Sequence, residues 1–480
     1  MIESPADSVN RHLSLVRRAS SGYHRSMRKL VVLLIVIAVL AGATWAIAGR
    51  LGGPAITITA PARFVGSSTP LEATIDAAAD RVSSLRVTIE QDGRTMDIAP
   101  AIAAEATAGG GPRVKVTGTI GPSTAPGLKS GPAKLTVTAA HPVLFGLRHN
   151  ASTVSRDVQV RLERPRVSVV SSHHFVNLGG TEAIVYRVSP NDVQSGVVVG
   201  DLEYPGFPAS GAHVEGVPAI ADPGLRIAFF ALRWDQKLDT PMRLFARDEA
   251  GNSVQADFEH QTFPKPQKQS RIELDDRFLS RVIPAILAGT TEVKPDGTLI
   301  DQFVVVNGEL RRKNAALIGS FAASTSPEML WQGQVFHPYT NSAAEAAFAD
   351  HRTYVYQGKE VDHQVHLGFD LASYANTPIV AANRGVVLYA AELGIYGNAV
   401  IIDHGMGIQS LYGHLSSIGV QPGATVEKGQ EIGKSGMTGM AGGDHLHFTM
   451  LVNGQMVTPV EWWDAHWIED RIVRKLREAR

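Results

Sequence analysis

The 480-residue chain contains no cysteine and carries almost no net charge. Without thiols it can form neither disulfide bonds nor thiolate metal sites. Its 45 lysine and arginine residues balance 46 aspartate and glutamate residues, which leaves a formal net charge of −1. Charges of both signs are mixed along the soluble part, so no basic patch of the kind that binds nucleic acid stands out. We therefore expect no nucleic-acid partner.

The zinc-protease motif HExxH is also absent, which excludes the helical metalloprotease site whose base is a glutamate. The chain has instead a group of five side chains able to bind metal or transfer protons: His366 and Asp370 in HLGFD, His414 in LYGHLS, and His445 and His447 in DHLHF. Two histidines and one carboxylate form a common catalytic zinc site with one position open for water. The other two histidines can move protons near neutral pH, so the base of such an enzyme would be a histidine.

The sequence around these residues predicts strands. The two histidines of DHLHF are two residues apart, so on a strand they share one face. Residues 445–452 are rich in apolar side chains and precede Asn453-Gly454, which predicts a strand ending in a hairpin turn. The two ligand-type residues of HLGFD also share a face, and Gly368 between them argues against a helix. Short β-rich runs separated by glycines over 380–414 indicate a compact antiparallel sheet.

The surroundings of the five residues resemble the M23 peptidases, the lysostaphin and LytM type of peptidoglycan endopeptidase. The resemblance runs from about Phe336 to Trp463, through ADHRTYVYQGK, HLGFDLA, TPIVAANRGVV, GIYGNAVIIDHGMGIQSLYGHLSSI and VQPGATVEKGQEIGKSGMTGMAGGDHLHF. Order, spacing and glycine placement all agree with the family. The resemblance implies a LytM-type antiparallel β-sheet domain with zinc metalloendopeptidase activity.

Residue roles also follow from the resemblance. It implies that His366, Asp370 and His447 bind Zn²⁺, and that His414 and His445 flank the metal-bound water as the catalytic pair. Which of the pair acts as the general base stays open. The expected substrate is peptidoglycan, cleaved in its stem peptides or cross-bridges during cell-wall remodelling.

Three nearby residues are expected to play other parts. The residue after HLHF is often Glu in the family and is Thr449 here, which we expect to change only local hydrogen bonding. His363 lies three residues before the HLGFD histidine and is expected to have a rim or structural role. His404, in DHGMG, is expected to orient a turn or support the site without binding metal.

Three other functions are compatible with parts of the sequence. The main alternative is a catalytically silent LytM-like scaffold that activates a partner cell-wall hydrolase, although such relatives typically lose ligands and all five positions are present here. The second is a wall-binding protein, and the third a transport adaptor with a lipoyl-like barrel. Cell-envelope protein partners are compatible with each of them.

A long apolar run lies near the N-terminus. Leu30–Gly49 contains no charged residue and has about the 20 residues that a bilayer-spanning helix needs. Because basic residues cluster before the run, the positive-inside rule predicts a single-pass plasma or inner membrane protein with a cytoplasmic N-terminus and a periplasmic or otherwise extracytoplasmic catalytic domain. Ala46-Ile47-Ala48 could instead mimic a signal-peptide cleavage site, but the long basic segment favours an uncleaved anchor. The basic residues are Arg11, Arg17, Arg18, Arg25, Arg28 and Lys29.

We therefore predict a multidomain, mainly β protein. Strand-like runs with Gly and Pro turns indicate two immunoglobulin-like β-sandwich regions before a partly helical linker. The C-terminal segment has an apolar stripe typical of an amphipathic helix, expected to pack on the catalytic domain. The expected segments are a cytoplasmic tail (1–29), a transmembrane anchor (30–49), two β-sandwich-like domains (50–164 and 165–262), a helical linker region (263–335), the M23 peptidase domain (336–463) and the C-terminal helix (464–480).

Overall fold

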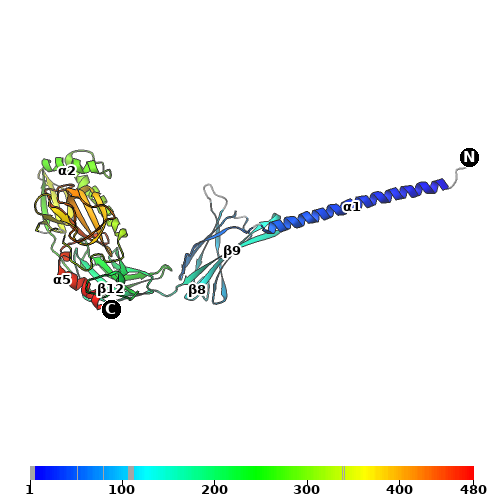
Figure 1. Ribbon diagram of the computed structural model, residues 1–480, viewed down its shortest axis with the longest axis horizontal. Coiled ribbons are helices and arrows are strands. Elements are labelled where there is room, and N and C mark those ends of the chain that lie inside the picture. Colours follow the sequence, from blue (N-terminus) through cyan, green and yellow to red (C-terminus); the bar gives the residue numbers. More distant parts are fainter. Residues whose placement is uncertain are drawn as a thin grey trace. The chain divides into compact units, whose positions relative to one another are not determined.

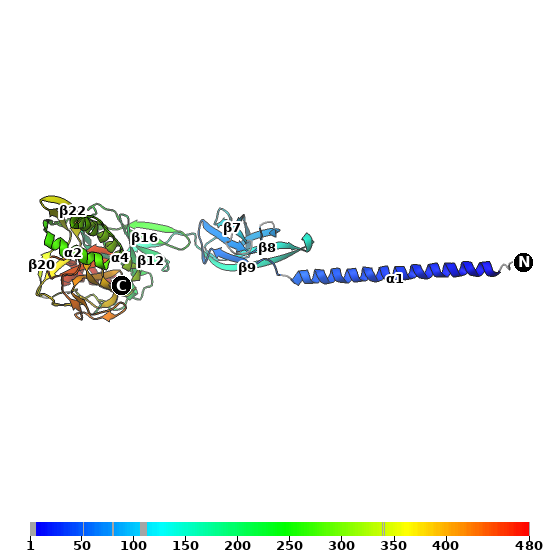
Figure 2. The ribbon, with the colours of Figure 1, turned by 90° about the horizontal axis from the view of Figure 1, so that it is seen from above.

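The computed structural model describes residues 6–50, 52–78, 81–105, 113–337, 339 and 341–479, and it is mainly β, as the sequence predicts. The chain separates into two compact units, residues 1–163 with 249–252 and residues 164–248 with 253–480. The first five residues of the predicted cytoplasmic tail lie outside the described part. Figures 1 and 2 show the ribbon from two directions.

The predicted anchor lies in helix α1 (Ala6–Arg50). Its segment Met27–Arg50 is long and apolar enough to cross a membrane. The leucine, isoleucine and valine side chains of this segment are exposed, Val39 to 63% and Leu40 to 61%. An apolar surface of this size is unfavourable in water and suits lipid.

The remainder of the first unit consists of two sheets that face each other across one apolar core. Alternate residues of each strand point inward, among them Leu71 and Val116 from one sheet and Ile89 and Leu135 from the other. This alternation is what a sheet with one solvated face requires. The first sheet contains β1 (Ile56–Ala60), β3 (Thr69–Ile75), β7 (Arg113–Ile120) and β6 (Ala101–Glu105), and the second β2 (Phe64–Val65), β9 (Arg148–Val160), β8 (Gly131–Val143), β4 (Ser84–Gln91) and β5 (Arg94–Ile98).

The second unit begins with a seven-stranded sheet and a parallel pair of short strands. Its strand β15, between β12 and β14, is buried along its whole length. The sheet contains β10 (Arg166–Val169), β12 (Thr181–Ser189), β15 (Leu225–Ala231), β14 (Leu202–Pro208), β13 (Gln194–Val199), β16 (Met242–Arg247) and β17 (Ser253–Asp257), and the pair is β11 (His174–Asn177) with β18 (His260–Phe263).

The predicted peptidase region is built on an eight-stranded sheet flanked by two smaller ones. Strand β31 ends at Asn453-Gly454 and turns into β32, as the sequence predicts. The large sheet contains β20 (Ala343–Ala346), β23 (Phe369–Ala372), β31 (Leu446–Val452), β27 (Ile408–Leu415), β26 (Asn398–Gly405), β25 (Gly385–Glu392), β29 (Thr425–Val426) and β32 (Gln455–Val457). The smaller sheets are β19 (Gln269–Leu274) with β21 (Asp350–Tyr356) and β22 (Lys359–His366), and β24 (Pro378–Val380) with β30 (Glu431–Lys434) and β28 (Ser417–Ile418).

Different elements cover the two faces of the large sheet. Ile401 of β26 belongs to a core shared with the helices α2 (Asp276–Gly289), α3 (Leu299–Val305) and α4 (Arg311–Ser320). The next residue, Ile402, belongs to a core that continues into the seven-stranded sheet. Figure 1 accordingly shows the orange strands between α2 and β12. The linker region 263–335 was predicted to be partly helical, and within it Gln269–Leu274 form strand β19, whose exposed and less exposed side chains alternate.

The C-terminal segment is helical, as expected, but it packs on β12 of the seven-stranded sheet. It consists of α5 (Ala465–Ile468), a π-helical turn (Glu469–Val473) and α6 (Arg474–Glu478). Lys475 Nζ donates to Glu182 Oε1 of β12 at 2.8 Å, and the two side chains are only 4% and 0% exposed. Burial raises the pKa of Glu182 and lowers that of Lys475, and their mutual attraction opposes both shifts.

This buried pair predicts a large stability effect. In a Lys475→Met variant the Glu182 carboxylate loses its cation inside the protein, which typically costs about 3–5 kcal/mol. Arg477→Met is the matched control, since Arg477 is in the same helix but its pair with Glu469 is half-exposed and should contribute under about 1 kcal/mol. Urea denaturation of the full chain in detergent measures both variants. Equal losses of unfolding free energy in the two variants would contradict the proposed role of the Glu182–Lys475 pair.

His404 lies in β26 and is completely buried. Its Nδ1 hydrogen-bonds the Arg384 carbonyl at 2.8 Å and its Nε2 the Ser410 hydroxyl at 2.7 Å. Its ring meets that of Phe336 edge-on. The side chain therefore fastens a turn to the sheet, in keeping with the orienting role expected from the sequence.

The burial of His404 predicts a loss of stability in acid. Burial lowers its pKa to about 4, whereas an imidazole in the unfolded chain has a pKa of about 6.5. Between these two values the unfolded state binds a proton that the folded state does not, so the free energy of unfolding falls as the pH falls. A His404→Gln variant should show a pH slope shallower by about 1.4 kcal/mol per pH unit in this window, measured by urea denaturation. An unchanged slope would refute this account.

Candidate metal centre

Three of the five predicted site residues converge on one point. His366 Nε2 lies 2.9 Å from Asp370 Oδ1 and 3.0 Å from His447 Nδ1, and His447 Nδ1 lies 3.0 Å from the same Asp370 oxygen. All three side chains are buried. Among the described residues, this is the one group of three ligand-type side chains whose donor atoms converge in this way.

The register of the strands creates this convergence. Strand β23 pairs with β31 so that Asp370 lies directly opposite His447, and β31 pairs with β27 so that His447 lies opposite Gly413. His366 ends β22, which leaves two residues, Leu367 and Gly368, for the chain to cross to β23. Gly368 is in this crossing, where a Cβ would fall 2.3 Å from the ring of His447. Only glycine leaves room there for the imidazole.

Hydrogen bonds outside the cluster fix the orientation of both imidazoles. His366 Nδ1 contacts the Ala347 carbonyl at 3.1 Å, so Nδ1 carries the proton. The lone pair of Nε2 is then free to bind a metal. The other ring uses the opposite nitrogen. His447 Nε2 contacts Thr449 Oγ1 at 3.1 Å, and the Thr449 hydroxyl itself donates to the Leu367 carbonyl at 2.8 Å. Thr449, expected to change only local hydrogen bonding, thus sets the tautomer of the imidazole beside it.

The protonation states also favour metal binding. Burial by itself would raise the pKa of Asp370, but the histidine cluster around it outweighs burial and holds the pKa well below its usual range. Burial lowers the pKa of His447 to about 4, more than its hydrogen bond with Asp370 raises it. At neutral pH the site therefore presents an ionised carboxylate beside a neutral imidazole, the state that a metal requires.

His414 and His445 border the cluster. The His414 ring lies 4.8 Å from that of His445 and 5.7 Å from that of His447, centroid to centroid. His445 Nε2 is 3.6 Å from Asp370 Oδ1. Each ring is held through Nδ1 by a backbone carbonyl at 2.8 Å, His414 by Thr438 and His445 by Gly443. These contacts leave the Nε2 of each ring available for proton transfer.

The environments of these two histidines push their pKa values apart. Burial, helped by the neighbouring His445 and His447, lowers the pKa of His414 well below its usual value. Burial acts on His445 in the same direction, but the attraction of Asp370 leaves its pKa raised. His414 also has a backbone φ of +62°, a left-handed conformation that is costly for a residue with a Cβ and is found mainly at functional sites.

One residue at the centre was not singled out from the sequence. Arg352 of β21 extends Nη2 to Asp370 Oδ2 at 3.3 Å, while Asp370 Oδ1 faces the histidines. Its Nε reaches Asp350 Oδ2 at 3.4 Å. Asp350 lies opposite His366 in the pairing of β21 with β22. The guanidinium thus binds the carboxylate oxygen that faces away from the cluster. Only the strand pairing reveals this contact.

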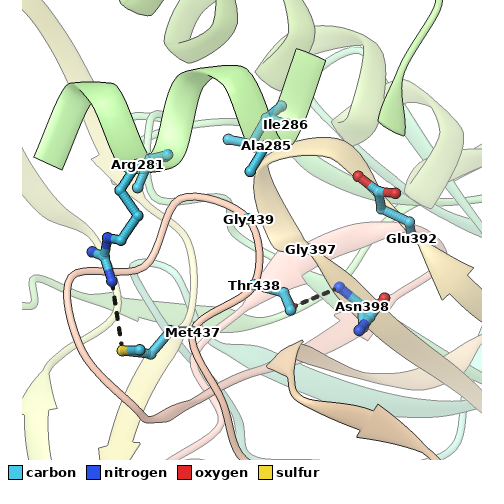
Figure 3. Close-up of a pocket in the computed structure, with 10 residues that line it drawn as sticks. Arg281, Ala285, Ile286, Glu392, Gly397, Asn398, Met437, Thr438 and Gly439 are labelled. Atoms are coloured by element: carbon cyan, nitrogen blue, oxygen red, sulfur yellow. Dashed lines mark hydrogen bonds between the residues drawn. The ribbon is translucent and has the colours of Figure 1, made fainter. Parts of the chain in front are cut away.

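Two hollows adjoin the site at helix α2. The first has a volume of about 330 Å³ and lies between α2 and the loop that carries Thr438, the residue that holds His414 (Figure 3). Arg281 projects from α2 toward Met437 in this view. The second has a volume of about 670 Å³ and is lined by Arg352, Tyr354 and Met440 among others. Arg281 lines both hollows and donates to the Ala441 carbonyl at 3.0 Å.

The chemistry of the cluster fits a zinc ion. Tetrahedral zinc with bonds of about 2.0–2.1 Å separates its ligand atoms by roughly 3.3 Å, close to the 2.9–3.0 Å between the three donor atoms here. Each imidazole carries its proton on the nitrogen that points away from the cluster, as metal-bound histidines do. Three protein ligands leave one tetrahedral position open.

Comparison with known proteins gives the class of this domain. Residues 364–459 match the model of Peptidase family M23. Over 97 residues the chain is 42% identical to the DD-carboxypeptidase/endopeptidase Mpg of Neisseria meningitidis serogroup B, covering 20% of this chain and 22% of that protein. Over 96 residues it is 40% identical to the peptidoglycan DD-endopeptidase ShyA of Vibrio cholerae serotype O1, with the same coverage.

The catalytic domain of lysostaphin from Staphylococcus simulans is 26% identical, with 26% of this chain and 92% of that domain covered and a TM-score of 0.22. The match to the model of Peptidase family M23 covers the three residues of the His–Asp–His cluster. The C-terminal part of the chain is a peptidase family M23 domain. The chain spans about a fifth of the length of the curated relatives it matches.

Proposed function

We propose that this protein is a zinc-dependent endopeptidase that hydrolyses peptide bonds in the stem peptides or cross-bridges of peptidoglycan. The observation that carries the proposal is the convergence of His366 Nε2, Asp370 Oδ1 and His447 Nδ1 to within 3.0 Å of one another. The names of the relatives support the substrate, because both Mpg and ShyA carry endopeptidase names and ShyA acts on peptidoglycan by name.

The proposed mechanism assigns separate tasks to the five residues. His366, Asp370 and His447 hold the metal, which when bound lowers the pKa of a water molecule and polarises a carbonyl group. Of the pair His414 and His445, one accepts the proton of the attacking water through Nε2. The other donates a proton to the leaving nitrogen or stabilises negative charge on the carbonyl oxygen. The fixed Nδ1 contacts of both rings reduce the reorganisation that these steps need.

The substrate would lie along the hollows beside α2. The two hollows share Arg281 and Met437 in their walls, which mix arginine and carboxylate groups with Phe278 and Met440. A depression with both apolar and charged walls suits an extended peptide that carries charged groups.

A digestion experiment tests the function. Purified peptidoglycan is incubated with the full chain in detergent and zinc, and the products are identified by mass spectrometry. We expect cross-linked muropeptides to disappear and fragments with one new amine and one new carboxyl group to form. A protein that binds one zinc but releases no fragment would overturn the enzyme assignment and favour the catalytically silent scaffold.

We further propose that α1 anchors the chain in the plasma or inner membrane, with the N-terminus in the cytoplasm and the peptidase domain outside. The proposal is supported by the exposed apolar surface of Met27–Arg50 and by the basic residues that precede it. Protease added outside intact spheroplasts should degrade the peptidase domain. Complete protection of that domain would refute the orientation.

A further inference from the structure

An unusual hairpin turn joins strands β8 and β9 in the first unit. Phe145 at its tip is fully exposed and Leu147 is 75% exposed, and no large apolar side chain among the described residues is more exposed than Phe145. Leu144 and Phe145 have φ values of +53° and +57°, a conformation that Asn and Gly adopt at much lower cost. Two bulky apolar residues thus occupy positions where water-exposed turns normally have small or polar ones.

The same hairpin is fastened to the end of α1. Arg148, the first residue of β9, donates to the Trp45 carbonyl at 3.0 Å and lies 5.4 Å from the centroid of the Trp45 ring. Asn150 donates to the Ala48 carbonyl at 2.8 Å. Gly49 lies beside this contact, where a Cβ would fall 2.3 Å from the present position of the Arg148 guanidinium.

These two contacts give the direction of the hairpin. Moving along β9 from Asn150 to Arg148, toward the tip, the partner on the helix changes from Ala48 to Trp45, toward the middle of the apolar segment. Trp45 lies about 7 Å before the helix end at Arg50, at 1.5 Å per residue. The tip residues, which precede Arg148, therefore lie level with Trp45 or further toward the middle of the span.

We propose that the tip of the β8–β9 hairpin, residues 144–147, is a second membrane contact that inserts into the interface of the lipid leaflet at the C-terminal end of α1. The tip supplies the apolar side chains Phe145 and Leu147, and Trp45 beside it is of the type enriched at membrane interfaces. Arg148 and Arg50 can extend their charged ends to the headgroups. The first unit would then be held against the bilayer at two points and would not swing freely from the helix.

This proposal rests on α1 crossing the membrane and is independent of the peptidase activity. It commits to lipid as the occupant because the hairpin is continuous with the membrane-spanning surface of α1. A protein partner that covers Phe145 is the alternative that the experiment must separate.

Because the chain has no cysteine, single-cysteine variants can carry an environment-sensitive fluorophore at chosen sites. The full chain is placed in vesicles of phosphatidylcholine and phosphatidylglycerol with the label at Phe145→Cys or Leu147→Cys. Asp92→Cys is the matched control, at the polar tip of the β4–β5 hairpin in the same unit and also with a positive φ. Leu40→Cys reports on the span itself. Aqueous iodide and spin-labelled lipids serve as quenchers.

We expect labels at 145 and 147 to be quenched by spin-labelled lipid and several-fold less by iodide than the label at 92. The hairpin contact would be overturned, with the anchor intact, if the label at 40 is quenched by lipid while the labels at 145 and 147 are as accessible to iodide as the label at 92. Labels at 145 and 147 that escape both quenchers would show a protein cover and would also overturn it. A label at 40 in water would refute the anchor, and the hairpin contact with it.

Discussion

Replacement of Asp370 by alanine is expected to abolish metal binding and hydrolysis together. Its Oδ1 is the one anionic ligand atom of the cluster. It lies within 3.0 Å of the ligand nitrogens of both histidines. Without it the site has two imidazoles and no anionic ligand, and the Arg352 guanidinium, which loses one of its two carboxylate partners, places positive charge beside them. Zinc content should fall from about one per chain to background, and His366→Ala should behave in the same way.

The measurement pairs metal analysis with the rate of hydrolysis of cross-linked muropeptides. His363→Ala is the control, because this histidine lies on the same strand as His366, three residues earlier, but is exposed and forms no part of the cluster. It should keep both the metal and the rate. Full zinc occupancy and full activity in Asp370→Ala would show that the ligand assignment is wrong.

His414→Ala and His445→Ala are each expected to reduce turnover by about 10²–10⁴-fold, the usual effect of losing a proton-transfer group, while zinc stays bound. Neither side chain completes the three-ligand set, yet both rings border it, His445 Nε2 at 3.6 Å from Asp370 Oδ1. The double variant should lose less than the product of the single losses, because both groups act on one reaction centre.

Turnover and metal content of each variant, again beside His363→Ala, check this prediction. A His445 variant that loses its metal would make His445 a ligand and require a new assignment of the pair. Normal turnover in either variant would remove that histidine from the mechanism.

Local sequence was sufficient where the information is local. The apolar run over residues 445–452 and the Asn453-Gly454 turn predicted strand β31 and its hairpin, because strand preference and turn chemistry act within a few residues. The charge-free run before Gly49 predicted the apolar part of α1 for the same reason. Residue types and spacing also identified the five polar residues that the fold brings together.

The contacts that orient these residues could not be read in this way. Asp370 faces His447 through the register of β23 with β31, and Arg352 reaches Asp370 from β21, a strand of another sheet. Register and sheet assignment depend on which strands pair, and pairing is decided by burial across the whole domain. The positive φ of His414 likewise results from the irregular pairing of β27 and not from its own side chain.

The C-terminal helix shows the same division. The sequence by itself determined that the segment after Trp463 is an amphipathic helix, since its apolar stripe recurs at the helical period. Only the tertiary structure decided that this stripe covers β12 and that Lys475 meets Glu182 there. An apolar stripe predicts that one face of the helix is buried, but it does not predict which surface covers that face. That choice depends on the shape and charge of surfaces formed by residues almost 300 positions away, as in this Glu182–Lys475 contact, and it exists only once the chain has folded.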